Sequence, residues 1–222
     1  MVTYEGTYKY EDFNKSGDSY TLKSNVPHFA SEANTQPGMP KYRDVNGDGV
    51  IDSNDCTTIG NGLPKHIGGF TNNFYYGDFD LSVFFQWSYG NDILNANRLM
   101  FESSWNKARE LNQYASYAER WTVDNPTSNI LRATSSSSNR VFSSRIIEDG
   151  SFLRLKTVTL GYSVPKKMLS RFKIDRLRIY FAAQNLFTLS NYSGYDPEVS
   201  IKDSALTPDL TVGHMNSAVS RP

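Results

Sequence analysis

The segment 79–89 constrains the fold of this chain more than any other part of the sequence, because apolar and polar side chains alternate along it. A period of two is typical of a β-strand with one apolar and one polar face. Phe84 is the one apolar residue on the polar side. The apolar face consists of Phe79, Leu81, Val83, Phe85, Trp87 and Tyr89. Two interpretations fit this strand: a strand of a soluble sandwich, or a lipid-facing strand that ends in interfacial aromatic residues.

Four other segments show strand patterns. They lie near residues 3–10, 67–76, 151–163 and 176–187. The third of them changes phase, since Leu153 and Leu155 fall on the opposite side from Val158. Either a β-bulge or the exit of the strand from a bilayer explains this change.

The connections between these strands differ greatly in length. They are short at 77–78 and moderate from 163 to 176, but long over 11–66, over 90–150 and after 187. Within 90–150, the spacing of Leu111, Tyr114, Ala115, Ala118 and Trp121 predicts a helix over 98–121. Short connections on one side of a meander and long ones on the other are typical of outer-membrane barrels. A soluble sandwich keeps most of its loops short.

Composition excludes several classes of protein. The 222 residues carry 23 basic and 23 acidic side chains, so the formal charge is zero and no nucleic-acid partner is expected. A single cysteine, Cys56, excludes an internal disulfide framework and a cysteine zinc site. No stretch approaches the roughly 20 apolar residues of a membrane-spanning helix, and the first residues do not read as a signal peptide.

One motif carries recognisable chemistry, the acidic loop 44–55. It matches a twelve-residue calcium loop, in which alternate oxygen-bearing residues and a glycine at position 6 surround the ion. Gly49 occupies position 6. The predicted ligands are Asp44, Asn46, Asp48, the carbonyl of Val50, Asp52 and Asp55. The sequence therefore predicts a structural Ca²⁺ site that holds a long loop rigid.

Two features of this loop leave an alternative open. Position 12 is Asp55 instead of the usual glutamate, and an Asp-rich turn also forms without a metal, through side-chain bonds to its own backbone. No second loop of this kind and no flanking helices are present, so a calcium sensor is not predicted. No catalytic motif is found either, and Glu148-Asp149 is expected to be a turn that precedes a strand.

Several motifs along the chain together resemble one family, the SusC/RagA-type TonB-dependent outer-membrane transporters. The motifs are spread over nearly the whole chain and follow one another in the family's order. They lie at 40–52, 59–64, 79–92, 147–156, 160–162, 184–188 and 192–198. The resemblance implies an all-β fold: about five or six antiparallel transmembrane strands of a larger barrel of about 22 strands, with long extracellular loops, one of which contains a short helix. The resemblance also implies that residues 1–222 are the C-terminal portion of such a barrel, without the plug domain and the final strand.

The resemblance also implies function and partners. Such transporters import oligosaccharides or peptides across the outer membrane of Gram-negative cells, powered by the TonB complex through the N-terminal part, and are not enzymes. A SusD-type surface lipoprotein closes over the extracellular loops, and lipid surrounds the barrel. Contact with the lid or the substrate is then expected at loop aromatic residues, namely Trp105, Tyr114, Tyr117 and Tyr192.

A different class of protein remains as the alternative, a soluble calcium-stabilised β-sandwich that acts as a carbohydrate-binding module. The high aromatic content of 14% and the Asp-Gly loops fit both classes. The strand faces separate them, because a sandwich buries its apolar face against a second sheet whereas a barrel turns that face to lipid.

Overall fold

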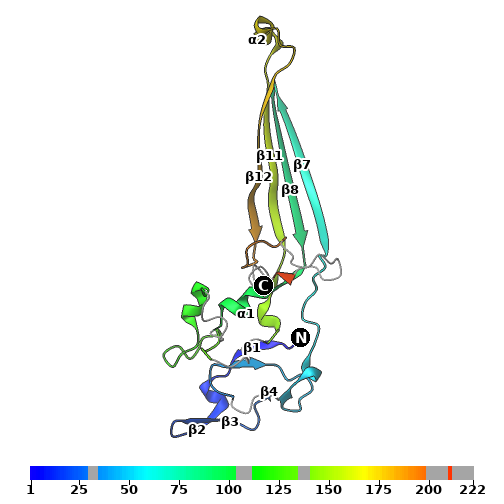
Figure 1. Cartoon of the computed structure of the whole chain (residues 1–222). Coiled ribbons are helices and arrows are strands. Elements are labelled where there is room, and N and C mark those ends of the chain that lie inside the picture. Colours follow the sequence, from blue (N-terminus) through cyan, green and yellow to red (C-terminus); the bar gives the residue numbers. More distant parts are fainter. Residues whose placement is uncertain (30–34, 104–111, 135–140, 199–209, 212–222) are drawn as a thin grey trace, which may run out of the picture. The chain divides into compact units, whose positions relative to one another are not determined.

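The computed structural model describes residues 1–29, 35–103, 112–134, 141–198 and 210–211. The chain divides into two compact units (Figure 1). One contains residues 1–60, 94–148 and 199–222, and the other contains residues 61–93 and 149–198. We call them the loop unit and the sheet unit.

The sheet unit is built on four long antiparallel strands in the order β12-β11-β8-β7 (Figure 1). Their bounds are β7 (His66–Tyr76), β8 (Phe79–Tyr89), β11 (Phe152–Ser163) and β12 (Arg178–Ser190). A two-residue turn joins β7 to β8, and its Gly77 has a φ of 58°, a backbone conformation that glycine adopts without steric cost. A short helical connection, α2 (Lys166–Leu169) and η7 (Ser170–Phe172), joins β11 to β12.

A β-bulge at Lys156 explains the phase change in β11. Leu155 pairs with Phe85 and Thr157 pairs with Phe84, so Lys156 is the extra residue relative to β8. The register to β12 shifts at the same point, near Asn185, whose φ is 52°. Side chains that lie directly opposite each other share one face of a sheet. The bulge therefore returns Leu153 and Leu155 to the face of Trp87 and Phe85, which decides between the two explanations that the sequence leaves open.

Of the strands predicted from the sequence, the one at 3–10 differs most from the observed structure. Only β1 (Tyr4–Thr7) is a strand, and it pairs with β5 (Pro40–Tyr42) in a two-stranded sheet of the loop unit. Gly6 has a φ of 114° beside a register shift, and η1 begins at Tyr10. β1 passes through the irregularity at Gly6 and ends at Thr7, which pairs with Pro40, the first residue of β5. The alternation of tyrosines therefore does not continue as one long strand.

The described elements of the loop unit are short. Besides β1 and β5, they include the hairpin β2 (Phe13–Ser16) and β3 (Ser19–Leu22), the parallel pair β4 (His28–Phe29) and β6 (Val50–Ile51), η1 (Tyr10–Asp12), η2 (Ser53–Asp55), and η6 (Ser144–Ile146). A three-stranded sheet has the order β10-β9-β13, with β9 at Asp92–Asn95, β10 at Ile147–Asp149 and β13 at Leu210–Thr211. Two small cores stabilise this unit, one around Tyr42 and Ile51 and the other around Tyr8 and Phe13.

The helix predicted over 98–121 is not continuous. In the described part of this range, the helical elements are α1 (Asn97–Phe101) and the 3₁₀ turn η4 (Ala115–Glu119), while 102–103 and 112–114 are not helical. Residues 104–111 lie outside the described part of the chain. The short segments fit the rule that a few helical turns without extensive packing are marginal in stability.

None of the helices in the described residues is long and apolar enough to cross a membrane.

Candidate functional site

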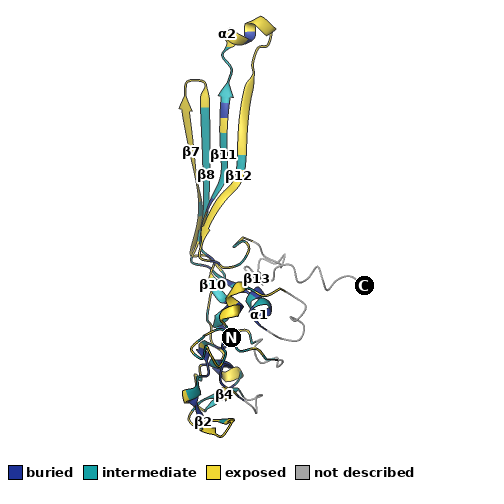
Figure 2. Ribbon diagram, turned by 90° about the vertical axis from the view of Figure 1, so that its left-hand side faces the viewer, coloured by how far each residue is buried: buried dark blue, intermediate teal, exposed yellow. Residues whose placement is uncertain are grey.

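The sheet unit has one apolar face that runs across all four strands. Register places the apolar residues of β8 opposite apolar residues of its neighbours, for example Leu81 opposite Phe74 and Leu160. On β12 the same face carries Ile179, Phe181, Phe187 and Leu189. Much of this face is exposed: Phe74 retains 53% of its surface and Phe181 retains 70% (Figure 2). Large contiguous apolar surfaces of this kind mark an interaction with a partner or a membrane.

Aromatic residues close one end of the apolar face. The Trp87 indole packs over Gly68 on the neighbouring strand, where any β-carbon would collide with it. Its Nε1 donates a hydrogen bond to Nδ1 of His66 at 3.2 Å, and the His66 ring stacks on Tyr89 at 5.1 Å. A shallow hollow of about 490 Å³ adjoins these rings, with Leu153 on its wall. Aromatic residues with one polar edge suit a boundary between an apolar phase and water.

The opposite face of the sheet is polar and carries an ion-pair cluster. Arg154 binds Asp196 through Nη2 at 2.6 Å and Glu198 through Nη1 at 2.5 Å. Lys156 at the bulge and Gln86 on β8 also bind Glu198, at 3.2 Å and 2.9 Å. Farther along this face, Arg178 pairs with Asp80 at 2.5 Å.

The Arg154 cluster fastens the segment 192–198 to the polar face. The Arg154 side chain is only 6% exposed, so water screens its two ion pairs little. Tyr192, one of the aromatic residues predicted to contact a lid or substrate, is 8% exposed and contributes to packing in this conformation. Local sequence patterns do not reveal this cluster, because its members come from three separate segments.

The loop 44–55 folds as a series of turns in which acidic side chains accept backbone N–H groups. Asp44 accepts from Gly47 at 2.6 Å and from Gly49 at 2.8 Å. Asn46 Oδ1 accepts from the N–H of Asp48, and Asp48 Oδ1 accepts from the N–H of Val50. Each of the three side chains lies at the loop surface and keeps lone pairs that these bonds do not use.

Asp52 and Asp55 close the loop. Asp52 accepts from the backbone of Asn54 at 2.7 Å and caps η2. Asp55 is fully buried and accepts N–H groups from Val45 at 2.8 Å and Asp52 at 2.9 Å. These backbone bonds, first that from Asp52 and then that from Val45, lower the pKa of Asp55. In the described residues, no group of three or more His, Cys, Asp or Glu side chains is arranged to hold a metal ion.

A buried ionic network stabilises the other long loop. Glu102 binds Arg145 at 2.6 Å and Arg98 at 3.1 Å, and Arg98 also reaches Glu148 at 3.3 Å. Burial lowers the pKa of Arg145, which Glu102 counteracts, and burial raises the pKa of the neighbouring Tyr4 to about 12. The network therefore joins the beginning and the end of the segment 94–148 in its charged form.

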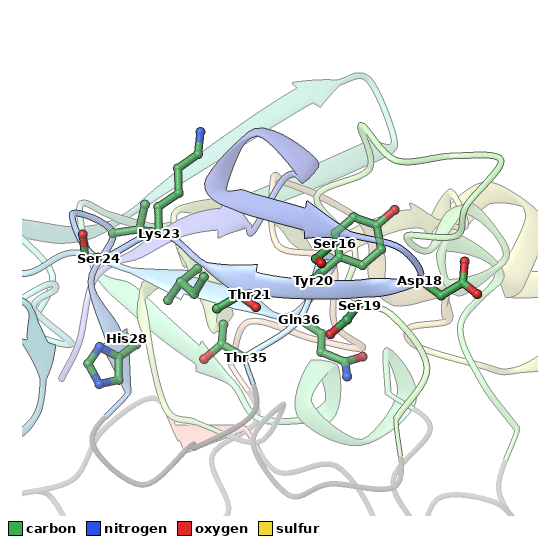
Figure 3. A pocket seen from close by; sticks show the side chains of 12 residues that line it. Ser16, Asp18, Ser19, Tyr20, Thr21, Lys23, Ser24, His28, Thr35 and Gln36 are labelled. Carbon is green, nitrogen blue, oxygen red and sulfur yellow. The ribbon is translucent and has the colours of Figure 1, made fainter.

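Two of the remaining candidate residues lie within packed surroundings. Tyr117 is buried, Tyr114 is half-buried against Phe101, and Trp105 lies outside the described residues. Asp149 accepts bonds from the side chain and backbone of Ser151, which lower its pKa. A polar hollow lies beside the hairpin β2–β3, lined by side chains such as Thr21 and Thr35. Of its described lining residues, Asp18 and Lys23 are charged, and they lie at opposite ends and point away from each other (Figure 3).

Comparison with known proteins identifies the family to which this chain belongs. No family model matches the chain. The TonB-dependent receptor P26 of Formosa agariphila is 37% identical over 164 residues, which cover 73% of this chain. The TonB-dependent receptor SusC of Bacteroides thetaiotaomicron is 28% identical over 169 residues. The chain belongs to the TonB-dependent receptors of the SusC type.

The likeness extends to structure. A solved structure of the RagAB peptide transporter superimposes with a TM-score of 0.66 at 22% identity, over 89% of this chain and 19% of that chain. At this identity the match shows a shared fold. The chain spans 16% of the length of the P26 receptor and 16% of the length of SusC, so it corresponds to one part of these receptors.

Proposed function

We propose that this chain forms a C-terminal part of the wall of an outer-membrane transporter. The four long strands belong to an antiparallel barrel of about 22 strands, with the apolar face toward lipid and the polar face toward the lumen. The connections 77–78 and 164–177 then lie on the periplasmic side and the long loops on the extracellular side, following the general rule for such barrels. The chain is a transport component and not an enzyme.

The observation that carries this proposal is the exposed apolar face. Strands of 11 to 13 residues are long enough for a tilted strand to cross the hydrocarbon core, which needs about 9–11 residues. A soluble sandwich would bury residues such as Phe70, Phe74 and Phe181, yet each retains more than half of its surface. The exposure therefore favours the transporter over the carbohydrate-binding module.

Two neighbouring substitutions on β8 test the orientation of the sheet. Val83 lies on the apolar face near the middle of the strand, and Ser82 lies on the polar face opposite Thr159. Arginine on the lipid face near the bilayer midplane costs about 2–4 kcal/mol. In the full reading frame, Val83→Arg is expected to lower the folded fraction in lipid vesicles, measured by resistance to gel denaturation without heating, and Ser82→Arg is expected to leave it near wild type. Equal effects of the two variants would refute the orientation.

The transported substrate and the partners follow from the same proposal. Import of oligosaccharides or peptides, energy from the TonB complex and a SusD-type lipoprotein lid are proposed on the resemblance to SusC and to RagAB, which is a peptide transporter. Purification of the full-length protein from its native membranes, followed by mass spectrometry of co-purified lipoproteins and retained ligands, separates the two substrate classes. Recovery without any lipoprotein would argue against the lid.

We also propose that the loop 44–55 binds one Ca²⁺ ion in a structural role. Asp44, Asn46, Asp48, Asp52 and the Val50 carbonyl would hold it; Asp55 would join them only by exchanging one of its two backbone bonds. The free lone pairs on the first three side chains support this proposal. Calorimetric titration with calcium is expected to show binding that Asp48→Ala abolishes and that the control Asp18→Ala, in the exposed turn after β2, preserves. No heat with the intact loop would overturn it.

A further inference from the structure

The connection between β11 and β12 concentrates positive charge at one end of the sheet (Figure 1). Residues 164–177 contain five basic side chains, Lys166, Lys167, Arg171, Lys173 and Arg176. Asp175 is the single acidic residue, so five positive charges minus one negative charge give this connection a net charge of +4. The chain as a whole has a formal charge of zero, which makes the local excess a property of this connection.

These charges are not used within the described structure. All five basic residues are exposed, and among the described residues none of their side chains forms an ion pair or hydrogen bond. Arg178, one residue beyond the connection, behaves differently because it pairs with Asp80. Unpaired like charges this close together repel one another, so their clustering is costly unless an anionic partner neutralises it.

Exposed apolar side chains alternate with the basic ones. Phe172 retains 70% of its surface, Met168 63% and Ile174 44%, while Leu169 is buried and anchors the turn (Figure 2). A short segment that mixes exposed aromatic and aliphatic residues with lysine and arginine is typical of a membrane interface, where the apolar groups enter the acyl boundary and the cations meet headgroups.

We propose that the connection 164–177 binds anionic phospholipids at the periplasmic surface of the membrane. This rests on the proposed function, because only a sheet that spans the bilayer brings its end to headgroup depth. Lys166, Lys167 and their neighbours then contact the phosphates, and Phe172 and Met168 insert at the edge of the acyl region. The phospholipid is favoured over an acidic protein partner because the connection continues directly from strands whose apolar face is turned to lipid.

The test uses the full-reading-frame protein in nanodiscs and titrates it with phosphatidylglycerol, with phosphatidylcholine as the neutral lipid. Retained lipid is counted by native mass spectrometry. The variant Lys166→Gln/Lys167→Gln is compared with the control Lys15→Gln/Lys65→Gln, which removes two exposed lysines elsewhere. A basic residue at a lipid surface is worth about fivefold in affinity, so the first variant is expected to lose roughly 25-fold for phosphatidylglycerol and the control nearly nothing. Phe172→Ser is expected to weaken both lipids.

Several results would overturn the proposal. Equal loss in the two double variants would mean that the binding is not local, and equal affinity for the two lipids would mean that charge plays no part. Displacement of the lipid by millimolar inorganic phosphate would indicate an anion site without a lipid. Retention in membranes after an alkaline wash distinguishes failure of the lipid-binding proposal from failure of the proposed function. Variants that stay in the membrane but bind lipid like wild type refute the lipid-binding proposal alone. A wild-type protein that is washed out refutes the proposed function as well.

Discussion

Insertion of one alanine after Lys156 tests whether the bulge in β11 keeps the apolar face continuous. The bulge holds one extra residue, Lys156, between the pair of Leu155 with Phe85 and the pair of Thr157 with Phe84. If 157–163 keep their pairing, a second extra residue turns 152–155 over, because a shift by one residue moves every side chain to the other face. Leu153 and Leu155 then leave the apolar face, and Arg154 enters it. The cost follows from these three side chains.

The magnitude is large relative to the stability of a protein. Removing a leucine from an apolar environment costs about 1.5–3 kcal/mol, so Leu153 and Leu155 together contribute about 3–6 kcal/mol. Arg154 pairs across the sheet with Gln86, beside the aromatic end, where an arginine on the lipid face costs about 1 kcal/mol. The expected total is about 4–7 kcal/mol, against a typical unfolding free energy of 5–15 kcal/mol.

The matched control keeps the bulge and removes only the side chain. Lys156→Ala loses one partly exposed ion pair with Glu198, which is worth less than about 1 kcal/mol. Both proteins are unfolded with guanidinium in lipid vesicles, and tryptophan fluorescence reports the unfolded fraction. The insertion is expected to abolish or severely weaken folding while Lys156→Ala remains close to wild type. Unfolding free energies of these two proteins that differ by less than about 1 kcal/mol would refute the role of the bulge.

Three further outcomes follow from the described contacts. Arg154→Met removes both ion pairs to the segment 192–198. Because hydrogen bonds to charged groups contribute about 1.5–3 kcal/mol, amide exchange in that segment should accelerate by roughly tenfold to hundredfold. Unchanged exchange would show that other contacts hold the segment. Gly68→Val places a side chain where the Trp87 indole lies, and overpacking of about 1–3 kcal/mol should destabilise the sheet unit and shift the tryptophan emission, whereas Thr71→Val, at an exposed position of the same strand, should leave both near wild type. Because the pKa of Asp55 is lowered in the folded protein, this carboxylate stabilises the fold above its unfolded pKa, near 3.9, and the stabilisation is lost as the pH falls through the lower folded value. Asp55→Asn should remove that acid dependence from amide exchange in the loop 44–55. An acid dependence that persists in the variant would assign it to another group.

The local sequence was sufficient to locate the long strands. The alternating segment 79–89 is the strand β8 residue for residue, and the predicted segments 67–76 and 151–163 differ from β7 and β11 by one residue. Strand periodicity is a local property of the chain, and for that reason it can be read without knowledge of the fold. The family could also be recognised from the order of its motifs, and the comparisons confirm it.

Contacts between distant segments could not be read in this way. The segment 3–10 alternates like a strand, yet its pairing with the short strand β5 limits β1 to four residues. In the acidic loop, the spacing of residues predicts which side chains carry oxygen, but only the folded loop shows that the two oxygens of Asp55 face backbone N–H groups.

The sequence by itself determined that this chain has two-faced strands, and the tertiary structure decided how those faces join. Alternation fixes which side chains of one strand share a side, because the pleat is a property of each backbone. Whether neighbouring strands present the same side depends on register, and here the register depends on the extra residue Lys156. The Arg154 cluster has the same origin: its charges lie far apart in sequence, and only the pairing of β8 with β11 and the return of 192–198 bring them within bonding distance.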